Sequence, residues 1–285
     1  MEENEMALPT VDFCGTAVTR LIIGGNPFRA YSHFSEELDR EMQNYYTCAN
    51  TVSALSDAER AGINTVVMRG DAIIFDVVRS YREQGGRMHW IAQTASEHPD
   101  FSVNIREIAA LGPLAIYYHG SRTDQCWKEG RIGEVADQLK EIRDLGCPVG
   151  LASHMPEVLR HAEEQGWDVD FYMTCLYNIS KVDRGSVIAG AARVEEPFDD
   201  PDRDIMCAFI RSTRKPCLAF KVLGSRRKAQ TPEMLRRAFA YALENIKPTD
   251  AMVVGMFQKY RDEAAENAAI VKQLLGQDEP GPTRK

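Results

Sequence analysis

The sequence predicts a single (β/α)8 TIM barrel, and three observations lead to this prediction. Eight short apolar runs alternate with longer amphipathic segments, which is the pattern of repeated βα units around a parallel sheet. An open doubly wound sheet usually ends at about five or six strands, whereas eight strand–helix pairs can close a barrel. The length of 285 residues and the 44% hydrophobic content fit one barrel of roughly 250 residues without a second domain.

The expected strands are short and rich in β-branched or aromatic residues. A Gly15-centred hairpin over Val11–Thr19 precedes them, and we expect this short N-terminal β-hairpin to cross the barrel floor. The eight predicted strands are Leu21–Gly24, Thr65–Met68, His89–Gln93, Leu114–Tyr118, Val149–Ala152, Phe171–Thr174, Cys217–Lys221 and Ala251–Gly255.

Amphipathic stretches between these strands predict the outer helices. The clearest start is Thr231-Pro232-Glu233, because threonine caps a helix and proline suits its first turn. The expected helices are Ser56–Ala61 with upstream residues, Ile73–Gln84, Val103–Leu111, Lys128–Leu145, Pro156–Gln165, Asp202–Ser212, Pro232–Asn245 and Tyr260–Leu275.

Three connections are longer than ordinary βα loops, namely Asn26–Asn50, Cys175–Asp202 and Lys221–Gln230. Barrel active sites are built from the loops that follow the strands, so long loops there indicate function. For the domain organisation we expect a flexible N-terminus over 1–10, one barrel domain over 11–276, and a disordered polar tail over 277–285.

Composition narrows the function classes. A formal charge of -8 and a pI near 5.4 argue against a nucleic-acid partner. The seven cysteines are odd in number and lack a CxxC pair, which favours reduced thiols. With no signal-peptide pattern and no apolar run of about 18 residues, we expect a cytoplasmic protein with a small-molecule substrate and no membrane partner. The sequence leaves the oligomeric state open.

Polar residues cluster where the predicted strands end. The carboxyl ends of parallel barrel strands meet at one mouth, so these side chains are expected to converge on a small-molecule site. They are Gly25 and Asn26; Arg69 and Asp71; Gln93 and Thr94; His119; Ser153 and His154; Cys175, Tyr177 and Asn178; Lys221; and Gly255 with Met256.

His119 follows the fourth predicted strand and is our first candidate for an acid/base group. Its alternative role is a buried histidine bonded to a backbone carbonyl. His154 is a second candidate, or a residue that only stabilises the turn into the next helix. With Asp71 the two imidazoles supply ligand types for a divalent metal. No HxH or HxxxH spacing supports a metal, so none is assigned.

Lys221 ends an apolar strand, where it can form a Schiff base, bind an anion, or pair with a carboxylate such as Asp71. The following Gly224–Lys228 segment is the most basic cluster of the chain; it is either an anion site or a solvated surface. Asp71 is a second acid/base candidate or a substrate-hydroxyl acceptor, and it also suits the N-cap of the helix that follows.

Several stretches, in the right order, together resemble the aldo/keto reductase superfamily. The resemblance lies in Val18–Gly25 (family VSRLGLGT), Ala61–Thr65 (AGINFFDTA), Val149–Glu157 (AIGVSNFSPE), Tyr177-Asn178 (YN), Ala219–Gly224 (AYSPLG), and Val254-Gly255 with Glu266-Asn267 (IPG and EN). It implies an aldo/keto reductase-like barrel that covers most of the chain.

The resemblance does not carry over the catalytic tetrad. The family's aspartate falls on Val67, its tyrosine near Ala72, and its lysine near Gln93 or Thr94; only the histidine has a counterpart, His119. Carbonyl reduction in this family needs the tyrosine as proton donor. The departure therefore puts ordinary reduction in doubt.

The resemblance also bears on an NADP(H) site. Ser153 matches the serine near the nicotinamide, Phe220 replaces the stacking tyrosine, and Gly224, Arg226 and Gly255 lie in matching loops. His154, Thr174 and Phe257 stand where the family has asparagine, glutamine and arginine.

The sequence thus favours isomerase- or lyase-like acid/base chemistry on a small polar, carbohydrate-like substrate. His119, Asp71 and Lys221 are the expected catalytic residues, and Asn26, Arg69, Gln93, His154, Tyr177 and Asn178 the expected substrate-binding residues. The alternatives are an NAD(P)H-dependent oxidoreductase with a non-standard proton donor, and a non-catalytic barrel that binds a metabolite or partner.

Overall fold

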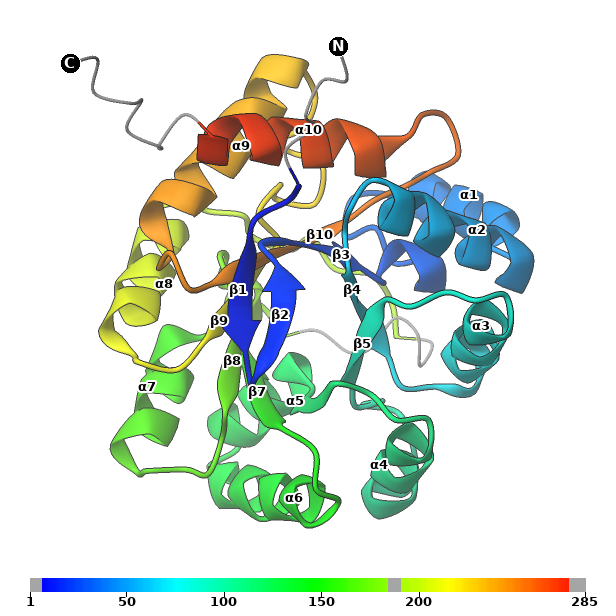
Figure 1. Ribbon diagram of the computed structural model, residues 1–285. Coiled ribbons are helices and arrows are strands. Elements are labelled where there is room, and N and C mark those ends of the chain that lie inside the picture. Colours follow the sequence, from blue (N-terminus) through cyan, green and yellow to red (C-terminus); the bar gives the residue numbers. More distant parts are fainter. Residues whose placement is uncertain (1–6, 184–190, 277–285) are drawn as a thin grey trace, which may run out of the picture.

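The computed structural model describes residues 7–183 and 191–276, and its centre is a closed barrel of eight parallel strands (Figure 1). The barrel order is β10-β3-β4-β5-β6-β7-β8-β9. This confirms the predicted (β/α)8 fold. The strands are β3 (Leu21–Gly24), β4 (Thr65–Arg69), β5 (His89–Gln93), β6 (Ala115–Tyr118), β7 (Val149–Ser153), β8 (Phe171–Cys175), β9 (Cys217–Phe220) and β10 (Ala251–Gly255).

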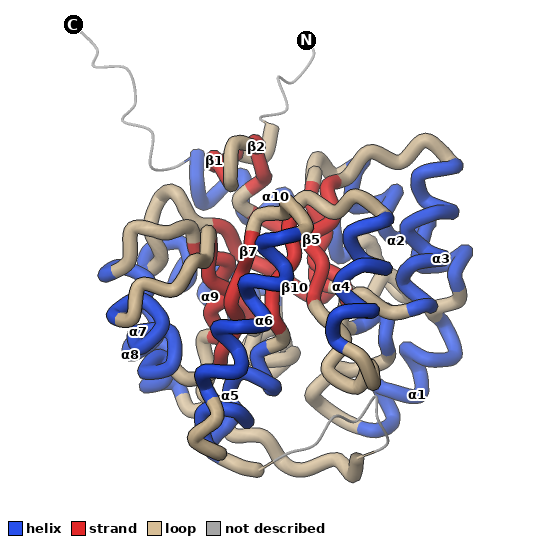
Figure 2. The backbone as a smooth tube through the Cα atoms, turned by 90° about the horizontal axis from the view of Figure 1, so that it is seen from below, coloured by secondary structure: helices blue, strands red, loops and turns tan. Residues whose placement is uncertain are grey.

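An antiparallel hairpin, β1 (Thr10–Phe13) and β2 (Thr16–Thr19), precedes the barrel as expected. Its two-residue turn uses Cys14 and Gly15, both with positive φ, which is the geometry that matches strand twist. Figure 2 shows the hairpin at one end of the barrel and the long loops at the other. Phe13 packs edge-on against Phe171 of β8 at 4.8 Å between ring centroids, so the hairpin fills the barrel floor.

The helices surround the strands as an outer ring (Figures 1 and 2). One core lies inside the barrel and includes Ile22, Ile91 and Phe171; a larger one lies between the strands and the helices. The two cores follow from side chains that alternate inward and outward along each strand. The helices are α1 (Glu36–Tyr45), α2 (Cys48–Arg60), α3 (Ala72–Glu83), α4 (Phe101–Ala110), α5 (Gly120–Lys128), α6 (Ile132–Asp144), α7 (Pro156–Glu164), α8 (Asp200–Ser212), α9 (Pro232–Asn245) and α10 (Glu263–Gly276), with 3-10 turns η1 (Pro27–Arg29) and η2 (Ile179–Lys181).

Two segments differ from the sequence expectation. The connection after β3 is not a plain loop, because it folds into η1 and α1, whose N-cap Ser35 accepts a hydrogen bond from Leu38 N. Helix α5 was missed, and the expected helix over Lys128–Leu145 begins only at Ile132, because Gly130 turns the chain with a φ of 69°. The sequence of α5, GSRTDQCWK, is mostly polar and shows no helical period of apolar residues, so it did not predict a helix.

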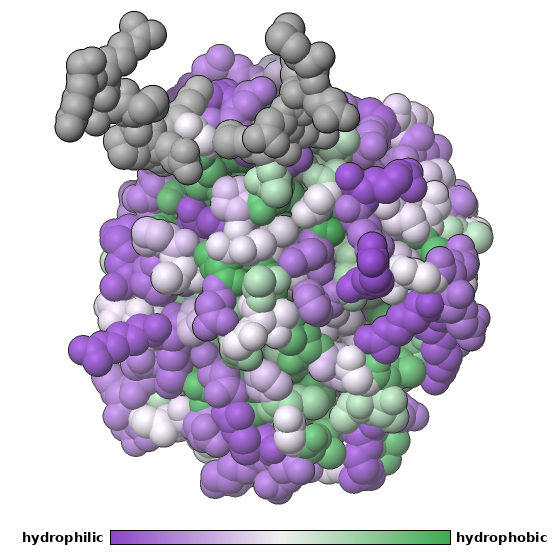
Figure 3. All heavy atoms as spheres, in the orientation of Figure 1, coloured by the Kyte–Doolittle hydropathy of each residue, from purple (hydrophilic) through white to green (hydrophobic). Residues whose placement is uncertain are grey.

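Leu8 is buried and Thr10 belongs to β1. Residues 1–6 of the expected N-terminal segment over 1–10, and the expected tail over 277–285, lie outside the described residues. No disulfide bond joins the cysteines of the described residues. Figure 3 shows the hairpin side of the molecule, where hydrophilic side chains predominate around the rim. No helix within 7–183 or 191–276 is long and apolar enough to cross a membrane.

Candidate functional site

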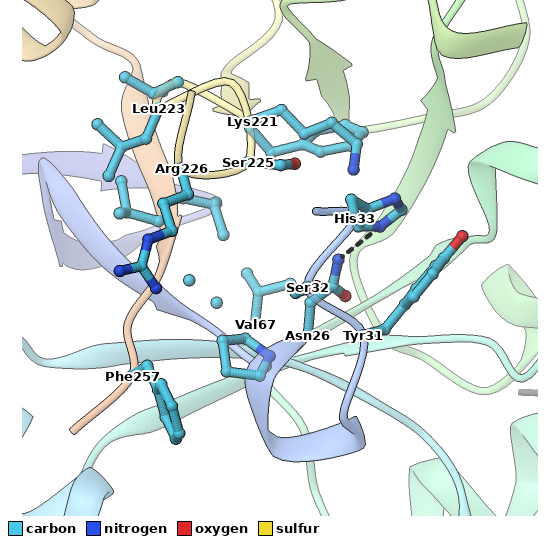
Figure 4. Close-up of a pocket in the computed structure, with 18 of the residues that line it drawn as sticks. Asn26, Tyr31, Ser32, His33, Val67, Lys221, Leu223, Ser225, Arg226 and Phe257 are labelled. Carbon is cyan, nitrogen blue, oxygen red and sulfur yellow. Dashed lines mark hydrogen bonds between the residues drawn. The ribbon is translucent and has the colours of Figure 1, made fainter. Parts of the chain in front are cut away.

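A cavity of about 570 Å³ opens at the carboxyl ends of the strands, and Figure 4 shows part of its lining. Most of the predicted strand-end residues line it, which brings them together as the barrel geometry requires. The predicted site residues in its lining are Asn26, Arg69, Gln93, His119, His154, Phe220, Lys221, Arg226 and Gly255. Asp71, Ser153, Tyr177, Asn178 and Gly224 do not line it.

His154 is held by a buried carboxylate. Its Nδ1 lies 2.6 Å from Asp124 Oδ2, and both side chains are buried. Ser153 and Ser180 donate their hydroxyls to the same carboxylate at 2.5 Å. Burial acts to raise the pKa of Asp124, but attraction to the His154 ring, when that ring is protonated, and the hydrogen bonds from His154, Ser153 and Ser180 outweigh it and hold the pKa below its usual value. Asp124 is thus an anion that fixes the imidazole ring.

His119 is the N-cap of α5. Its Nδ1 accepts the backbone N–H of Ser121 at 3.1 Å, so the neutral ring carries its proton on Nε2. His154 differs, because its Nδ1 must donate a hydrogen bond to the Asp124 carboxylate. A neutral His154 ring therefore carries its proton on Nδ1 and its lone pair on Nε2. The two histidines follow the neighbouring strands β6 and β7, and both line the cavity; a Cβ added to Gly120, which follows His119, would meet His154 Cε1 at 3.3 Å.

The cavity lining is rich in basic side chains although the chain is acidic, and Arg29, Arg69 and Arg261 form ion pairs with nearby carboxylates. Its described lining contains five basic side chains and one carboxylate, Glu263. Arg69 is buried, and desolvation lowers its pKa to about 10, so it remains charged at neutral pH. Arg226 forms no ion pair with any described residue and extends into the cavity (Figure 4). The five basic residues are Arg29, Arg69, Lys221, Arg226 and Arg261.

Asp71 lies beside the cavity rather than in its lining. One oxygen accepts the backbone N–H of Ile74 and caps α3; the other accepts from Arg29 Nε at 2.8 Å and lies 3.5 Å from Arg69 Nε. Asp71 therefore both caps the helix and holds two arginines of the cavity in place.

The cavity loops contain strained backbone. Six described non-glycine residues have positive φ, and five of them lie in the loops after β3 and β9. Such left-handed geometry costs roughly 1–2 kcal/mol per residue and collects at functional sites. Strand β9 ends one residue earlier than expected because Lys221 has a φ of 60°. The five residues are Ala30, His33, Lys221, Ser225 and Arg226.

Arg227 joins these two loops. Its Nη1 donates to the carbonyl oxygens of His33, Gly224 and Ser225, and its guanidinium lies over the Phe198 ring at 4.1 Å. Burial lowers the pKa of Arg227. The basic cluster after β9 is thus divided: Arg227 is structural, whereas Arg226 faces the cavity.

Tyr177 and Asn178 lie beneath the mouth, away from the cavity lining. Tyr177 is buried and packs against Phe198, while Asn178 caps η2 by accepting from Ser180 N. Gly224 occupies a turn with a φ of 55°. Among the expected cofactor contacts, Phe220 lines the cavity and packs edge-on against His154 at 5.7 Å between ring centroids.

The structure contains a second carboxylate–histidine pair, which the sequence analysis did not predict. His33 Nδ1 lies 2.6 Å from Glu196 Oε2, and His33 Nε2 lies 3.2 Å from Asn26 Nδ2. Asp124 and Glu196 are far from their histidines in sequence, so no short-range pattern pairs them. Tyr117 was also missed; it lines the cavity and accepts a hydrogen bond from Gln93 Nε2 at 3.0 Å, and burial raises its pKa.

No group of three or more His, Cys, Asp or Glu residues within 7–183 and 191–276 is arranged to hold a metal. The position of the aldo/keto reductase aspartate, Val67, lines the cavity as an apolar side chain. Thr94, near the position of the family's lysine, is buried, and its hydroxyl accepts the His119 backbone N–H at 3.1 Å.

No protein-family model and no curated protein matches this chain. Solved structures match its fold. Gox0644 in its apo form aligns at a TM-score of 0.60 and 12% identity, over 98% of this chain and 97% of that one. Aldo-keto reductase AKR11C1 from Bacillus halodurans, in its holo form, aligns at a TM-score of 0.54 and 10% identity, over 95% of this chain and 96% of that one. N-acetylmannosamine-6-phosphate 2-epimerase from Clostridium perfringens aligns at a TM-score of 0.51 and 12% identity, over 90% of this chain and 93% of that one. These similarities show a TIM-barrel fold shared with enzymes of several families, one of them an aldo-keto reductase.

Proposed function

We propose that this protein is an enzyme of isomerase or lyase type that moves a proton next to the carbonyl group of a small polar, carbohydrate-like substrate. One observation carries the proposal: His154, oriented by Asp124, and His119 follow the neighbouring strands β7 and β6 and both line the cavity, and their hydrogen bonds leave the lone pair of a neutral ring on His154 Nε2 and the proton on His119 Nε2. A lone pair and a proton on neighbouring imidazoles are what acid/base catalysis needs.

The steps follow from these roles. His154 Nε2 removes the proton from the carbon beside the carbonyl, and the electron pair of that C–H bond moves to the carbonyl oxygen. His119 Nε2–H donates a hydrogen bond to the developing enolate oxygen. For an α-hydroxy carbonyl substrate, the α-hydroxyl proton passes to the enolate oxygen while His154 returns its proton to the former carbonyl carbon, which moves the carbonyl to the α carbon and isomerises the substrate. If the original carbonyl instead re-forms with expulsion of a leaving group from the β carbon, the reaction is a lyase reaction.

The cationic lining supports an anionic substrate or intermediate. Lys221 and Arg69 stabilise negative charge that develops on the oxygen, and in a desolvated cavity such charge–charge interactions exceed those in water. Asp71, for which the sequence predicts an acid/base role, acts in this proposal by positioning Arg29 and Arg69. Tyr177 and Asn178 act through the shape of the mouth.

Proton exchange with solvent tests the proposal without a known product. Aldoses, ketoses, hydroxy acids and their phosphates are incubated with the protein in D2O, and 1H NMR follows loss of the signal beside the carbonyl. We expect exchange with at least one anionic compound. His154→Ala should abolish it and His119→Ala should reduce it at least about a hundredfold, with circular dichroism unchanged. His98→Ala, outside the cavity lining, is the control; full exchange in His154→Ala would refute the proposal.

A second candidate is an NAD(P)H oxidoreductase in which His119, with an amide or water, replaces the missing tyrosine. It is favoured by the reach of the cavity along the β9 and β10 loops to Arg226, Phe257 and Asn267, which is more than a small substrate needs. Fluorescence titration with NADPH and NADH decides between the two. Micromolar binding that Arg226→Ala weakens supports the oxidoreductase; deuterium exchange with no nicotinamide present supports proton transfer.

A further inference from the structure

The second carboxylate–histidine pair lies across the barrel from the first. His33 belongs to the loop after β3 and His154 directly follows β7, and these strands are four places apart in either direction around the closed barrel. We propose that Glu196 and His33 position the carboxamide of Asn26, so that Asn26 Oδ1 accepts a hydrogen bond from a hydroxyl group of the substrate. This inference rests on the proposed function and adds the recognition of a hydroxyl on the wall opposite His154.

Glu196 determines which atoms donate and which accept in the hydrogen bonds that join Glu196, His33 and Asn26. An ionised carboxylate can only accept, so His33 Nδ1, at 2.6 Å from Glu196 Oε2, donates. The neutral ring then has a lone pair on Nε2, and Asn26 Nδ2 donates to it at 3.2 Å. The carboxamide oxygen of Asn26 is left on the opposite side of the amide group (Figure 4).

Asn26 Oδ1 is accessible to a bound molecule. Asn26 is an exposed residue, yet it lies two positions after the buried strand β3 and lines the cavity. No described residue donates a hydrogen bond to its Oδ1. This oxygen is therefore an acceptor that a substrate donor can satisfy.

The histidine is held rigidly enough to fix the amide. Its side chain and that of Glu196 are buried, the Tyr31 ring packs against it at 3.8 Å between centroids, and Arg227 Nη1 donates to its carbonyl. His33 also has a φ of 56°, a conformation that persists only where the surroundings enforce it. Rotating the Asn26 amide by half a turn would bring Oδ1 against the Nε2 lone pair, so the network selects one orientation.

A fixed acceptor discriminates between substrates. A ligand with a hydroxyl at this position satisfies Oδ1, whereas its deoxy analogue displaces water and leaves the oxygen unpaired. Sites that hydrogen-bond a substrate hydroxyl reject the analogue that lacks it. Asn26 is thus a specificity-determining residue, and His33 and Glu196 are positioning residues.

The first test needs no substrate. Two-dimensional 15N–1H NMR of the full chain at neutral pH reports the tautomer of each histidine, and His33→Gln assigns the His33 signals. We expect a neutral His33 with its proton on Nδ1. A doubly protonated His33, or one protonated on Nε2, would require Asn26 to present Oδ1 to the ring and would overturn the proposal.

The second test compares pairs of hydroxy-carbonyl compounds with their deoxy analogues, by deuterium exchange and by thermal shift of the protein. We expect a preference of about tenfold for one hydroxyl position, lost in Asn26→Ala and kept in the control Asn245→Ala on α9. His33→Leu should lower the preference while Asn26 remains. A preference unchanged in Asn26→Ala refutes the proposal. If no compound exchanges, proton transfer fails as the function, while the tautomer and thermal-shift results still decide this inference.

Discussion

Asp124 Oδ2 lies 2.6 Å from His154 Nδ1, and four further hydrogen bonds, from the Ser153 and Ser180 hydroxyls and twice from the His154 backbone N–H, reach the same buried carboxylate. The whole arrangement is assembled from α5, β7 and η2. It determines that Nδ1 of His154 is bonded to the carboxylate and that Nε2 is left for other partners, and three of the predictions below depend on it.

Replacing Asp124 with asparagine removes the charge but keeps the shape. We expect Asp124→Asn to lower the exchange rate by roughly 10²–10⁴-fold, because the amide no longer enforces the Nδ1–H tautomer or stabilises the imidazolium. KM should change little, since Asp124 does not touch the substrate. A loss below about tenfold would show that His154 works without its partner.

Stability should depend on pH through Asp124. Its folded pKa lies below the unfolded one, so its contribution is present above about pH 4 and is lost as the pH falls through the folded value. Urea unfolding of wild type and Asp124→Asn at several pH values should show a gap of about 3 kcal/mol near neutral pH that narrows in acid. A gap that widens in acid would contradict this assignment.

Gly120 offers a small perturbation of His154. An alanine there places Cβ 3.3 Å from His154 Cε1, so the ring must shift by a few tenths of an ångström. We expect Gly120→Ala to reduce turnover about tenfold with a change in unfolding free energy below about 1 kcal/mol. Gly133→Ala on α6 is the matched control, because its Cβ meets open space; it should retain full activity. Equal activities would mean that the ring position is not critical.

Lys221 should show opposite effects on stability and activity. Its φ of 60° suits glycine, so Lys221→Gly relieves strain and is expected to raise the unfolding free energy by up to about 1 kcal/mol while turnover is lost. Lys228→Gly in the same loop has no positive φ to relieve and should destabilise the protein. Denaturant midpoints and exchange rates on the same samples measure both effects; destabilisation by Lys221→Gly would contradict the strain argument.

The fold could be predicted because its signals are local. Each apolar run such as Phe171–Thr174 is read from neighbours in the chain, and eight of them define a barrel. His119 and Lys221 followed from their places at strand ends. Asp124 and Glu196 could not be found in this way, because each is distant in sequence from the histidine that it contacts. Asp124 lies 30 residues from His154 and Glu196 lies 163 residues from His33, and the pairs form only when the barrel folds. Asp71 is an intermediate case, because its pattern fits a cap and an active-site acid equally.

The hairpin at the barrel floor determines by which end of the barrel a small molecule can reach the cavity. With Phe13 packed against Phe171 inside the barrel, molecules cannot pass through the barrel from end to end. Under the proposed function, substrate then enters and product leaves by the same mouth, at the loops after β3 and β9. Product that remains there excludes the next substrate, so we expect competitive inhibition by product.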